Sequence, residues 1–119
     1  MILPKIIDGN QIQAGKFAGV QGEWKRLITA DQTEEGMIVG YGVLRPGENR
    51  GWHIHKPGEE EVLYILSGVA TAMWREDGVV KTQNMCHGSI LYTPAGLDNT
   101  LANNGTEDVT TVYFIKTTK

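Results

Sequence analysis

The chain has almost no cysteine and no long apolar run. Cys86 is the only cysteine among 119 residues, so no internal disulfide can form. We expect its side chain to be small, apolar and partly buried, with a reactive thiol as the alternative because His87 lies beside it. No apolar run approaches the roughly 20 residues of a membrane span. The apolar start at residues 1–10 contains Pro4 and Lys5 and lacks the order of a signal peptide. These absences predict a cytoplasmic protein with no membrane partner.

The chain also lacks a strong charge of either sign. Its 11 basic and 14 acidic residues give a net charge of −3 and are mixed along the sequence. This balance predicts no nucleic-acid partner. At 119 residues the chain is expected to form one domain, residues 1–119, with a core that needs neither a disulfide nor a structural metal.

What the sequence does have is apolar residues that alternate at a period of two almost throughout. This pattern predicts β-strands, and no segment favours a helix. Asp77-Gly78, between two alternating runs, is the clearest signal of a tight hairpin. Many short strands in a chain of this length predict an all-β fold, a sandwich or a double-sheet jelly roll. The expected strands are 24–29, 37–45, 52–55, 61–66, 69–75, 79–84, 89–92, 98–102 and 109–116, with 2–7 as a further candidate.

Two of the expected strands are apolar on both faces. In 61–66, Leu63 and Ile65 alternate with other apolar side chains, and 109–115 behaves in the same way. An antiparallel sheet with one face in water would alternate apolar and polar residues instead. Both faces of these strands must therefore be covered, by the chain itself or by a partner. We predict a homodimer.

His53, His55 and Glu61 form the most informative pattern. Residues i and i+2 of a strand point to one face, so both imidazoles can meet at one point while Trp52 and Ile54 face the other way. Glu61 begins the next strand and can add a carboxylate oxygen. Two histidines and one carboxylate are a ligand set of non-haem Fe(II) enzymes and some zinc hydrolases. The alternatives are two ordinary strand histidines and a solvated glutamate in an acidic run.

The same stretch resembles the first signature of the cupin superfamily, G-x5-H-x-H-x(3,4)-E-x6-G. The residues that fit it are Gly47, His53, His55, Glu61 and Gly68. The gap between the second histidine and the glutamate is five residues, longer than the signature allows.

The longer gap makes Glu59 and Glu60 alternatives, since they satisfy the shorter spacing. We favour Glu61 because the count to Gly68 fixes its place in the strand. It also shares the parity of Leu63, whereas Glu59 falls in the turn.

A second stretch resembles the second cupin signature, G-x5-P-x-G-x2-H-x3-N. The residues that fit it are Gly88, Pro94, Gly96 and Asn103. Asn99 stands where the family places its third histidine. The two signatures lie at about 47–68 and 88–103, and the resemblance extends over about 36–116. It implies the cupin fold, a double-stranded β-helix or jelly-roll β-barrel, in which homodimers are common.

Asn99 leaves three outcomes open. The site could hold a metal through His53, His55 and Glu61, with additional open positions for substrate and water. Asn99 could instead be a weak fourth ligand or contact a substrate or a metal-bound water. The site could also have lost its metal and become a plain binding pocket. His87 is not expected to replace the missing ligand, because a whole strand separates it from this end of the barrel.

The walls of the pocket are harder to assign. Tyr41 and Tyr113 lie in strands expected to line the barrel, and we favour Tyr113 as an inward side chain with its hydroxyl near a ligand. Arg45 and Arg50 flank the first signature and could meet an anionic substrate. The alternative for both arginines is a solvated loop position.

These features predict a small metal-binding cupin enzyme that acts on a small polar organic molecule. The cofactor would be one divalent transition metal, Fe, Mn, Ni or Zn. The resemblance implies dioxygenase, isomerase, decarboxylase or lyase chemistry without choosing among them, and no catalytic residue is assigned. The first alternative is a non-catalytic module that binds a sugar or an organic acid, which Asn99 favours. The second alternative is a storage-like cupin whose pocket is filled by side chains. The His-x-His pair argues against this alternative.

Overall fold

A computed structural model describes residues 3–15, 17 and 19–117. In this part of the chain it contains nine strands and two three-residue 3-10 helices, η1 (Gly9–Gln11) and η2 (Ala30–Gln32). The strands are β1 (Glu23–Ile28), β2 (Met37–Leu44), β3 (His53–Ile54), β4 (Glu60–Ser67), β5 (Ala70–Glu76), β6 (Val79–Met85), β7 (Ile90–Thr93), β8 (Asp98–Ala102) and β9 (Val109–Lys116). All nine strands expected from the alternation are present, with ends that differ by at most one residue. No helix of the described residues is long and apolar enough to cross a bilayer.

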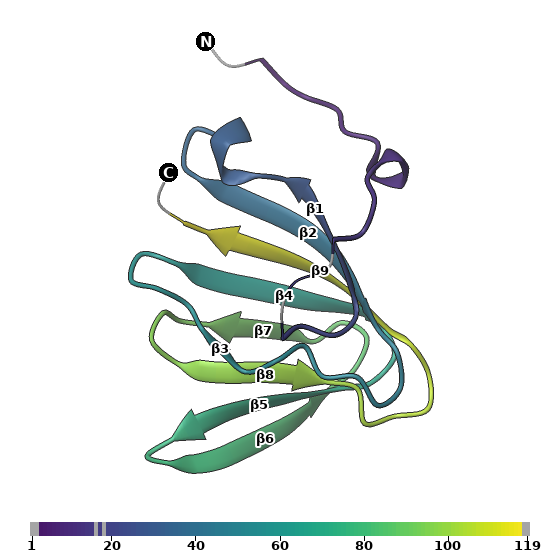
Figure 1. The fold of residues 1–119 in the computed structure, drawn as a ribbon, viewed down its shortest axis with the longest axis vertical. Helices are drawn as coiled ribbons and strands as arrows, with labels where there is room; N and C mark the ends of the chain where they lie inside the picture. The colour runs from purple at the N-terminus through teal and green to yellow at the C-terminus, as the bar shows by residue number, and fades with distance from the viewer. Residues whose placement is uncertain (1–2, 16, 18, 118–119) are drawn as a thin grey trace.

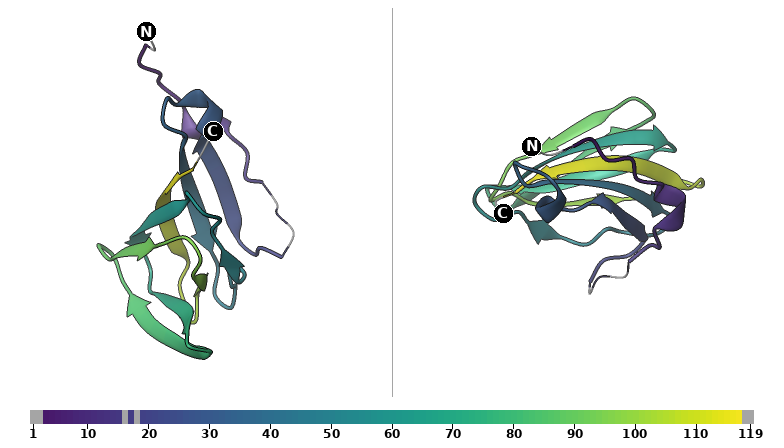
Figure 2. Two further views of the ribbon diagram at one scale, coloured as in Figure 1. Left: turned by 90° about the vertical axis from the view of Figure 1, so that its left-hand side faces the viewer. Right: turned by 90° about the horizontal axis from the view of Figure 1, so that it is seen from above.

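The strands form two antiparallel sheets that face each other (Figures 1 and 2). One sheet has the order β1-β2-β9-β4-β7 and the other β3-β8-β5-β6. Neighbours in space are often distant in sequence, since β9 lies between β2 and β4, and β8 lies between β3 and β5. This arrangement confirms the predicted all-β, double-sheet jelly-roll fold.

Strand alternation places the core between the two sheets. On β4 the inward positions are Glu61, Leu63 and Ile65, all almost fully buried, while Val62 faces out. Burying a leucine or isoleucine side chain contributes about 1.5–3 kcal/mol, so these positions fix the register of the strand. A one-residue slip would move Glu61 out of the interior together with the core residues. The other fully buried apolar side chains of the described core include Leu44, Leu101 and Val109.

The hairpin between β5 and β6 has the predicted two-residue turn. Asp77 and Gly78 have φ angles of 52° and 77°, as a type I′ turn requires. Asn103 closes the other end of the barrel. Its buried amide donates to the carbonyls of Leu44 (2.9 Å) and Glu107 (2.8 Å). The last residue of the second signature therefore ties the end of β2 to the loop before β9.

The N-terminal segment lies outside both sheets, beside β1 (Figures 1 and 2). Gly15 forms an isolated bridge with Trp24, and the Lys25 ammonium donates to the Gly9 carbonyl (3.4 Å). The strand expected over 2–7 is wrong for its described residues. Residues 3–7 pair with no strand, and two of their apolar side chains, Leu3 and Ile6, are 70% and 100% exposed. Residues 1–2 lie outside the described chain.

The turn between β6 and β7 corrects one expectation and confirms another. Cys86 is exposed and not partly buried, because it comes after the inward Met85 that ends β6. His87 is an exposed turn residue, as expected, and its ring contacts Tyr64 edge-on at 6.4 Å between centroids.

Candidate metal centre

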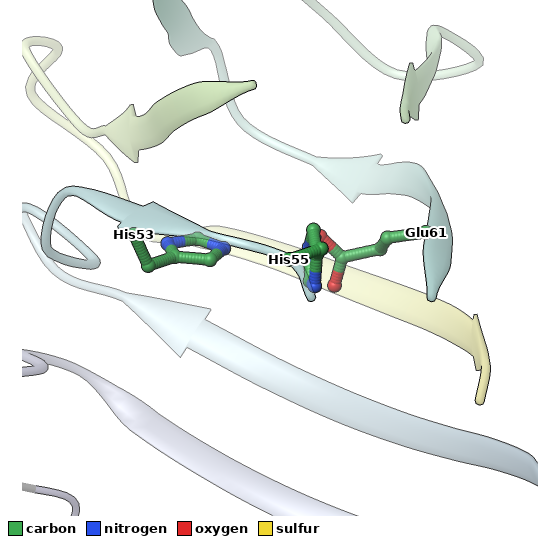
Figure 3. Close-up of side chains that lie close together, drawn as sticks. All are labelled: His53, His55 and Glu61. Atoms are coloured by element: carbon green, nitrogen blue, oxygen red, sulfur yellow. The ribbon is translucent and has the colours of Figure 1, made fainter. Parts of the chain in front are cut away.

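His53 and His55 come from β3 and from the residue just after it. β3 is short and pairs only with β8, with His53 opposite Asn99. The two imidazole rings stand perpendicular to each other with their centroids 5.0 Å apart (Figure 3). Ile54, between them, is exposed. The i, i+2 spacing thus brings both rings to the same side of the strand.

Glu61 reaches the two histidines from β4 (Figure 3). Its side chain is buried, and its Oε1 lies 3.4 Å from His55 Nε2. One ligand atom from each of His53, His55 and Glu61 falls within 4.8 Å of the others. Ligands that surround one metal at about 2.0–2.2 Å lie roughly 3–4 Å from one another, so a small side-chain adjustment would close the group on an ion. These three residues could hold a metal.

The hydrogen bonds of the imidazoles fit metal binding. His53 Nδ1 lies 2.9 Å from the Gly51 carbonyl, which can only accept, so Nδ1 carries the proton and Nε2 keeps its lone pair. Nε2 of His53 and Nε2 of His55 are both buried without a hydrogen-bond partner among the described residues. Buried polar atoms are rarely left unpaired, and a second hydrogen bond that fixes the tautomer is typical of metal-bound histidine.

The charge state of the group also suits a cation. Burial lowers the pKa of His53, with a smaller contribution from the charge of Arg50, and this favours the neutral imidazole that a metal needs. Burial of Glu61 works to raise its pKa. The Arg50 charge, the closely placed His55 ring and the hydrogen bonds from Arg50 outweigh that effect and lower the pKa to about 2. Glu61 is therefore a carboxylate at neutral pH.

Arg50 is the main feature of the site that the sequence did not resolve. Its guanidinium donates two hydrogen bonds to the Glu61 carboxylate, of 2.9 and 2.8 Å. The Arg50 side chain is only 13% exposed, so the solvated alternative does not apply to it. Arg45 is different, since it is half exposed and pairs at the surface with Glu23 at 2.8 Å.

An aromatic pair holds the Arg50 guanidinium from the other side. Its carbon lies 4.8 Å from the ring of Trp24 and 5.3 Å from the ring of Tyr113, and the two rings contact each other edge-on. Both rings pack on glycines of β2, where a Cβ at Gly40 would overlap the Tyr113 ring and one at Gly42 the Trp24 ring. Two glycines at i, i+2 within an apolar strand were the available sequence signal for this packing.

A cavity of about 310 Å³ opens beside the group. Its walls include both histidines and, among the other polar side chains, Arg26, Arg50, Glu59 and Tyr113. This volume is at the lower end of the range for small-molecule sites. The histidines therefore border a space that admits a small ligand.

The two tyrosines have different positions. Tyr113 lies on the wall of the cavity, and burial raises the pKa of its hydroxyl, with the charges of Arg50 and Arg26 partly opposing the change. Tyr41 is not on this wall. It borders a separate surface hollow with Lys25 and Leu27.

Asn99 lies beside the group without joining it in this structure. Its amide nitrogen donates to the backbone carbonyls of His53 (3.1 Å) and Leu97 (3.0 Å). The side chain borders a second cavity, of about 170 Å³, together with Trp74 and Thr93. His87 is in the turn before β7 and is not part of the three-residue group.

The fold and this group define a small double-sheet β-protein with a candidate two-histidine, one-carboxylate metal centre. The Cupin domain family (Cupin_2) matches residues 40–115, and the chain belongs to that family. No curated protein matches the sequence.

Several solved structures share the fold. A predicted oxalate decarboxylase from Thermotoga maritima is 21% identical, with a TM-score of 0.78 over 95% of this chain and 99% of the other. The polyketide cyclase RemF from Streptomyces resistomycificus is 14% identical, with a TM-score of 0.77 over 96% and 80%. A mutant of the oxalate decarboxylase OxdC from Bacillus subtilis is 21% identical, with a TM-score of 0.75 over 93% of this chain and 29% of the other. At these identities the likeness shows a common fold.

Proposed function

We propose that this protein is a metal-dependent cupin enzyme that acts on a small polar organic molecule. His53, His55 and Glu61 would hold one divalent transition metal, Fe, Mn, Ni or Zn. The observation that carries the proposal is the pair of buried Nε2 atoms, which have no hydrogen-bond partner among the described residues and lie beside a buried carboxylate. A set of two nitrogens and one oxygen suits these metals and leaves coordination positions for substrate.

A metal bound there would supply Lewis acidity toward a carbonyl or carboxylate group of the substrate. The protein would supply the positioning. The Gly51 carbonyl fixes the His53 tautomer, and Arg50 fixes the Glu61 carboxylate. The carboxylate pair uses two of the five guanidinium N–H donors of Arg50, and no acceptor for the other three appears among the described residues.

These remaining donors support a small organic acid as the substrate, since a guanidinium on a cavity wall is suited to bind a carboxylate. The oxalate decarboxylase OxdC from Bacillus subtilis, one of the similar structures, is named for such an acid, which supports the same class. Dioxygenase, isomerase and lyase reactions remain within the proposal, because the fold does not select the reaction.

We also infer a homodimer, through the outer face of the five-stranded sheet. Val62 lies opposite Tyr92 on one side and Phe114 on the other, and all three are exposed. Ile90 extends the same face and is 64% exposed. A contiguous apolar face of this kind is typical of a protein interface. Sedimentation at micromolar concentration should give twice the 13.1 kDa chain mass, and a 13.1 kDa species alone would refute the dimer.

Metal analysis tests the proposed function. Protein purified without an affinity tag or chelator should contain about one equivalent of a transition metal per chain, and His53→Ala should lose it while remaining folded. His87→Ala is the matched control, because its imidazole is exposed in a turn away from the group. Protein that lacks metal and does not take up added Fe, Mn, Ni or Zn would favour a non-catalytic sugar- or acid-binding module. The Asn99 amide, held by two backbone carbonyls, supports that alternative.

A further inference from the structure

Arg26 is a second arginine on the wall of the metal-site cavity. It projects from β1 and is exposed, with its guanidinium 5.5 Å from the ring of Phe17, another wall residue. Tyr113 lines the same cavity, and burial raises the pKa of its hydroxyl while the charge of Arg26 works against that larger effect. Within the described residues, no carboxylate forms an ion pair with Arg26. It is a cation of the cavity without a fixed counter-charge.

Tyr113 connects the two arginines. Arg50 lies over the face of its ring, and Arg26 acts through its charge on the hydroxyl at the end of that ring. Arg50 is buried beside the histidines, whereas Arg26 is at the solvent side. The two guanidinium groups therefore mark an inner and an outer position along one wall.

The charges of the site leave an excess of positive charge once a divalent ion is present. Arg50 is neutralised by Glu61, and an imidazole that binds a metal is neutral and adds no charge. The cavity wall also carries Arg26 and Glu59. Their charges sum to zero, although the two side chains do not form an ion pair. A divalent cation would thus be left with its full charge in a cavity closed on one side. A ligand with two negative charges would neutralise it.

We propose that the cavity selects small organic acids with two acidic groups, and that Arg26 determines this specificity. The inference rests on the proposed function and gives its substrate class in more detail. One carboxylate occupies the inner position beside the histidines and the free donors of Arg50. The second meets Arg26 at the outer position, where Tyr113 can also hydrogen-bond it. A cavity of about 310 Å³ has room for a dicarboxylic acid of a few carbons.

Binding of matched acids tests the inference. Succinate and butyrate have the same four-carbon chain and differ in the second carboxylate. Their dissociation constants should be measured by calorimetry and by amide chemical shifts, on the protein as purified and after loading with Zn²⁺ or Mn²⁺. Succinate should bind more tightly than butyrate. Arg26→Gln should weaken succinate roughly three- to tenfold, the range for one partly exposed ion pair, and leave butyrate nearly unchanged. Arg26→Lys should retain part of the preference.

Arg45→Gln is the control, because Arg45 is exposed and pairs with Glu23 outside the cavity wall. It should leave both affinities unchanged. Equal binding of the two acids to the wild type, an unchanged preference in Arg26→Gln, or binding of neither acid would overturn the inference. Failure of the proposed function is a separate result. In that case the protein takes up no metal, and the preference for succinate and its dependence on Arg26 can still be measured.

Discussion

Arg50 and Glu61 form a bidentate ion pair inside the barrel, with hydrogen bonds of 2.9 and 2.8 Å. The same carboxylate lies 3.4 Å from the Nε2 of His55. One glutamate therefore faces both a fixed cation and the proposed position of a metal. The guanidinium keeps the carboxylate ionised and oriented, but its charge also opposes a second cation beside it. Stability of the metal-free protein and affinity for the metal should consequently respond to Arg50 in opposite directions.

Arg50→Met should destabilise the metal-free protein and tighten its binding of metal. Removing one partner of a buried ion pair leaves the other charge unpaired and costs about 3–5 kcal/mol. Urea unfolding with and without Zn²⁺ measures both effects, and the added metal should recover much of the loss. Arg45→Met is the matched control and should cost far less stability, since its pair with Glu23 is at the surface. Equal losses in the two variants would contradict the role given to the buried pair.

The stability of the metal-free protein should fall between about pH 4.5 and pH 2. Glu61 has a pKa of about 2 in the folded state against 4.5 for the unperturbed group. Its ionised form therefore contributes fully to the stability of the fold above pH 4.5, and this contribution is lost as the pH falls to about 2. This contribution is roughly 3 kcal/mol at neutral pH. Urea unfolding from pH 2 to 6 should show a shallower slope for Glu61→Gln than for the wild type. Parallel curves would show that another carboxylate controls the acid transition.

Gly40→Ala should disturb the site without touching a ligand residue. The added Cβ would overlap the ring of Tyr113, which must then move off β2 and change its position against Arg50. Overpacking of this kind costs about 1–3 kcal/mol, and the near-ultraviolet circular dichroism of the aromatic pair should change with it. Gly105→Ala is the control, because a Cβ there meets its nearest neighbour at an ordinary 3.4 Å. A Gly40→Ala protein with wild-type stability and spectrum would show that the ring has room to shift.

Asn99→His should tighten metal binding. Position 99 is directly opposite His53 in the ladder, so an imidazole there starts beside the existing group. The change removes the amide bonds to the His53 and Leu97 carbonyls, so a modest loss of metal-free stability should accompany it. Competition with a chromophoric chelator would measure the Zn²⁺ affinity of both proteins. An affinity that does not change would show that side chains at position 99 do not reach the metal.

The sequence was sufficient for features that depend on local periodicity. Alternation identified the nine strands, and it placed Glu61 on the inward parity of Leu63 and Ile65, where the structure buries it. The i, i+2 spacing of the histidines likewise depends on one strand alone. The apolar residues 3–7 show the limit of this reasoning, since an apolar pattern does not by itself form a strand and these residues pair with none.

The burial of Arg50 could not be predicted, because it depends on residues from three strands that are far apart in the sequence. Trp24 comes from β1, Glu61 from β4 and Tyr113 from β9, and they meet around the arginine only when the two sheets have closed. A loop arginine with the same neighbours in sequence would be solvated in most proteins. Cys86 is the opposite case. Its apolar character suggests burial, but it follows the last residue of β6 and is exposed.

The strand that carries the histidines is the shortest of the described barrel. β3 consists of His53 and Ile54, which pair with Asn99 and Asp98 of β8, and an isolated bridge joins Asn49 before it to Ala102. Few ladder hydrogen bonds hold this segment, so it should open locally more often than β4 or β9. An ion bound between His53, His55 and Glu61 would join this weakly held segment to the well-packed β4. The amide protons around β3 would then exchange slowly only in molecules that contain metal. The exchange rate of this one short strand would therefore report how much of the site is occupied.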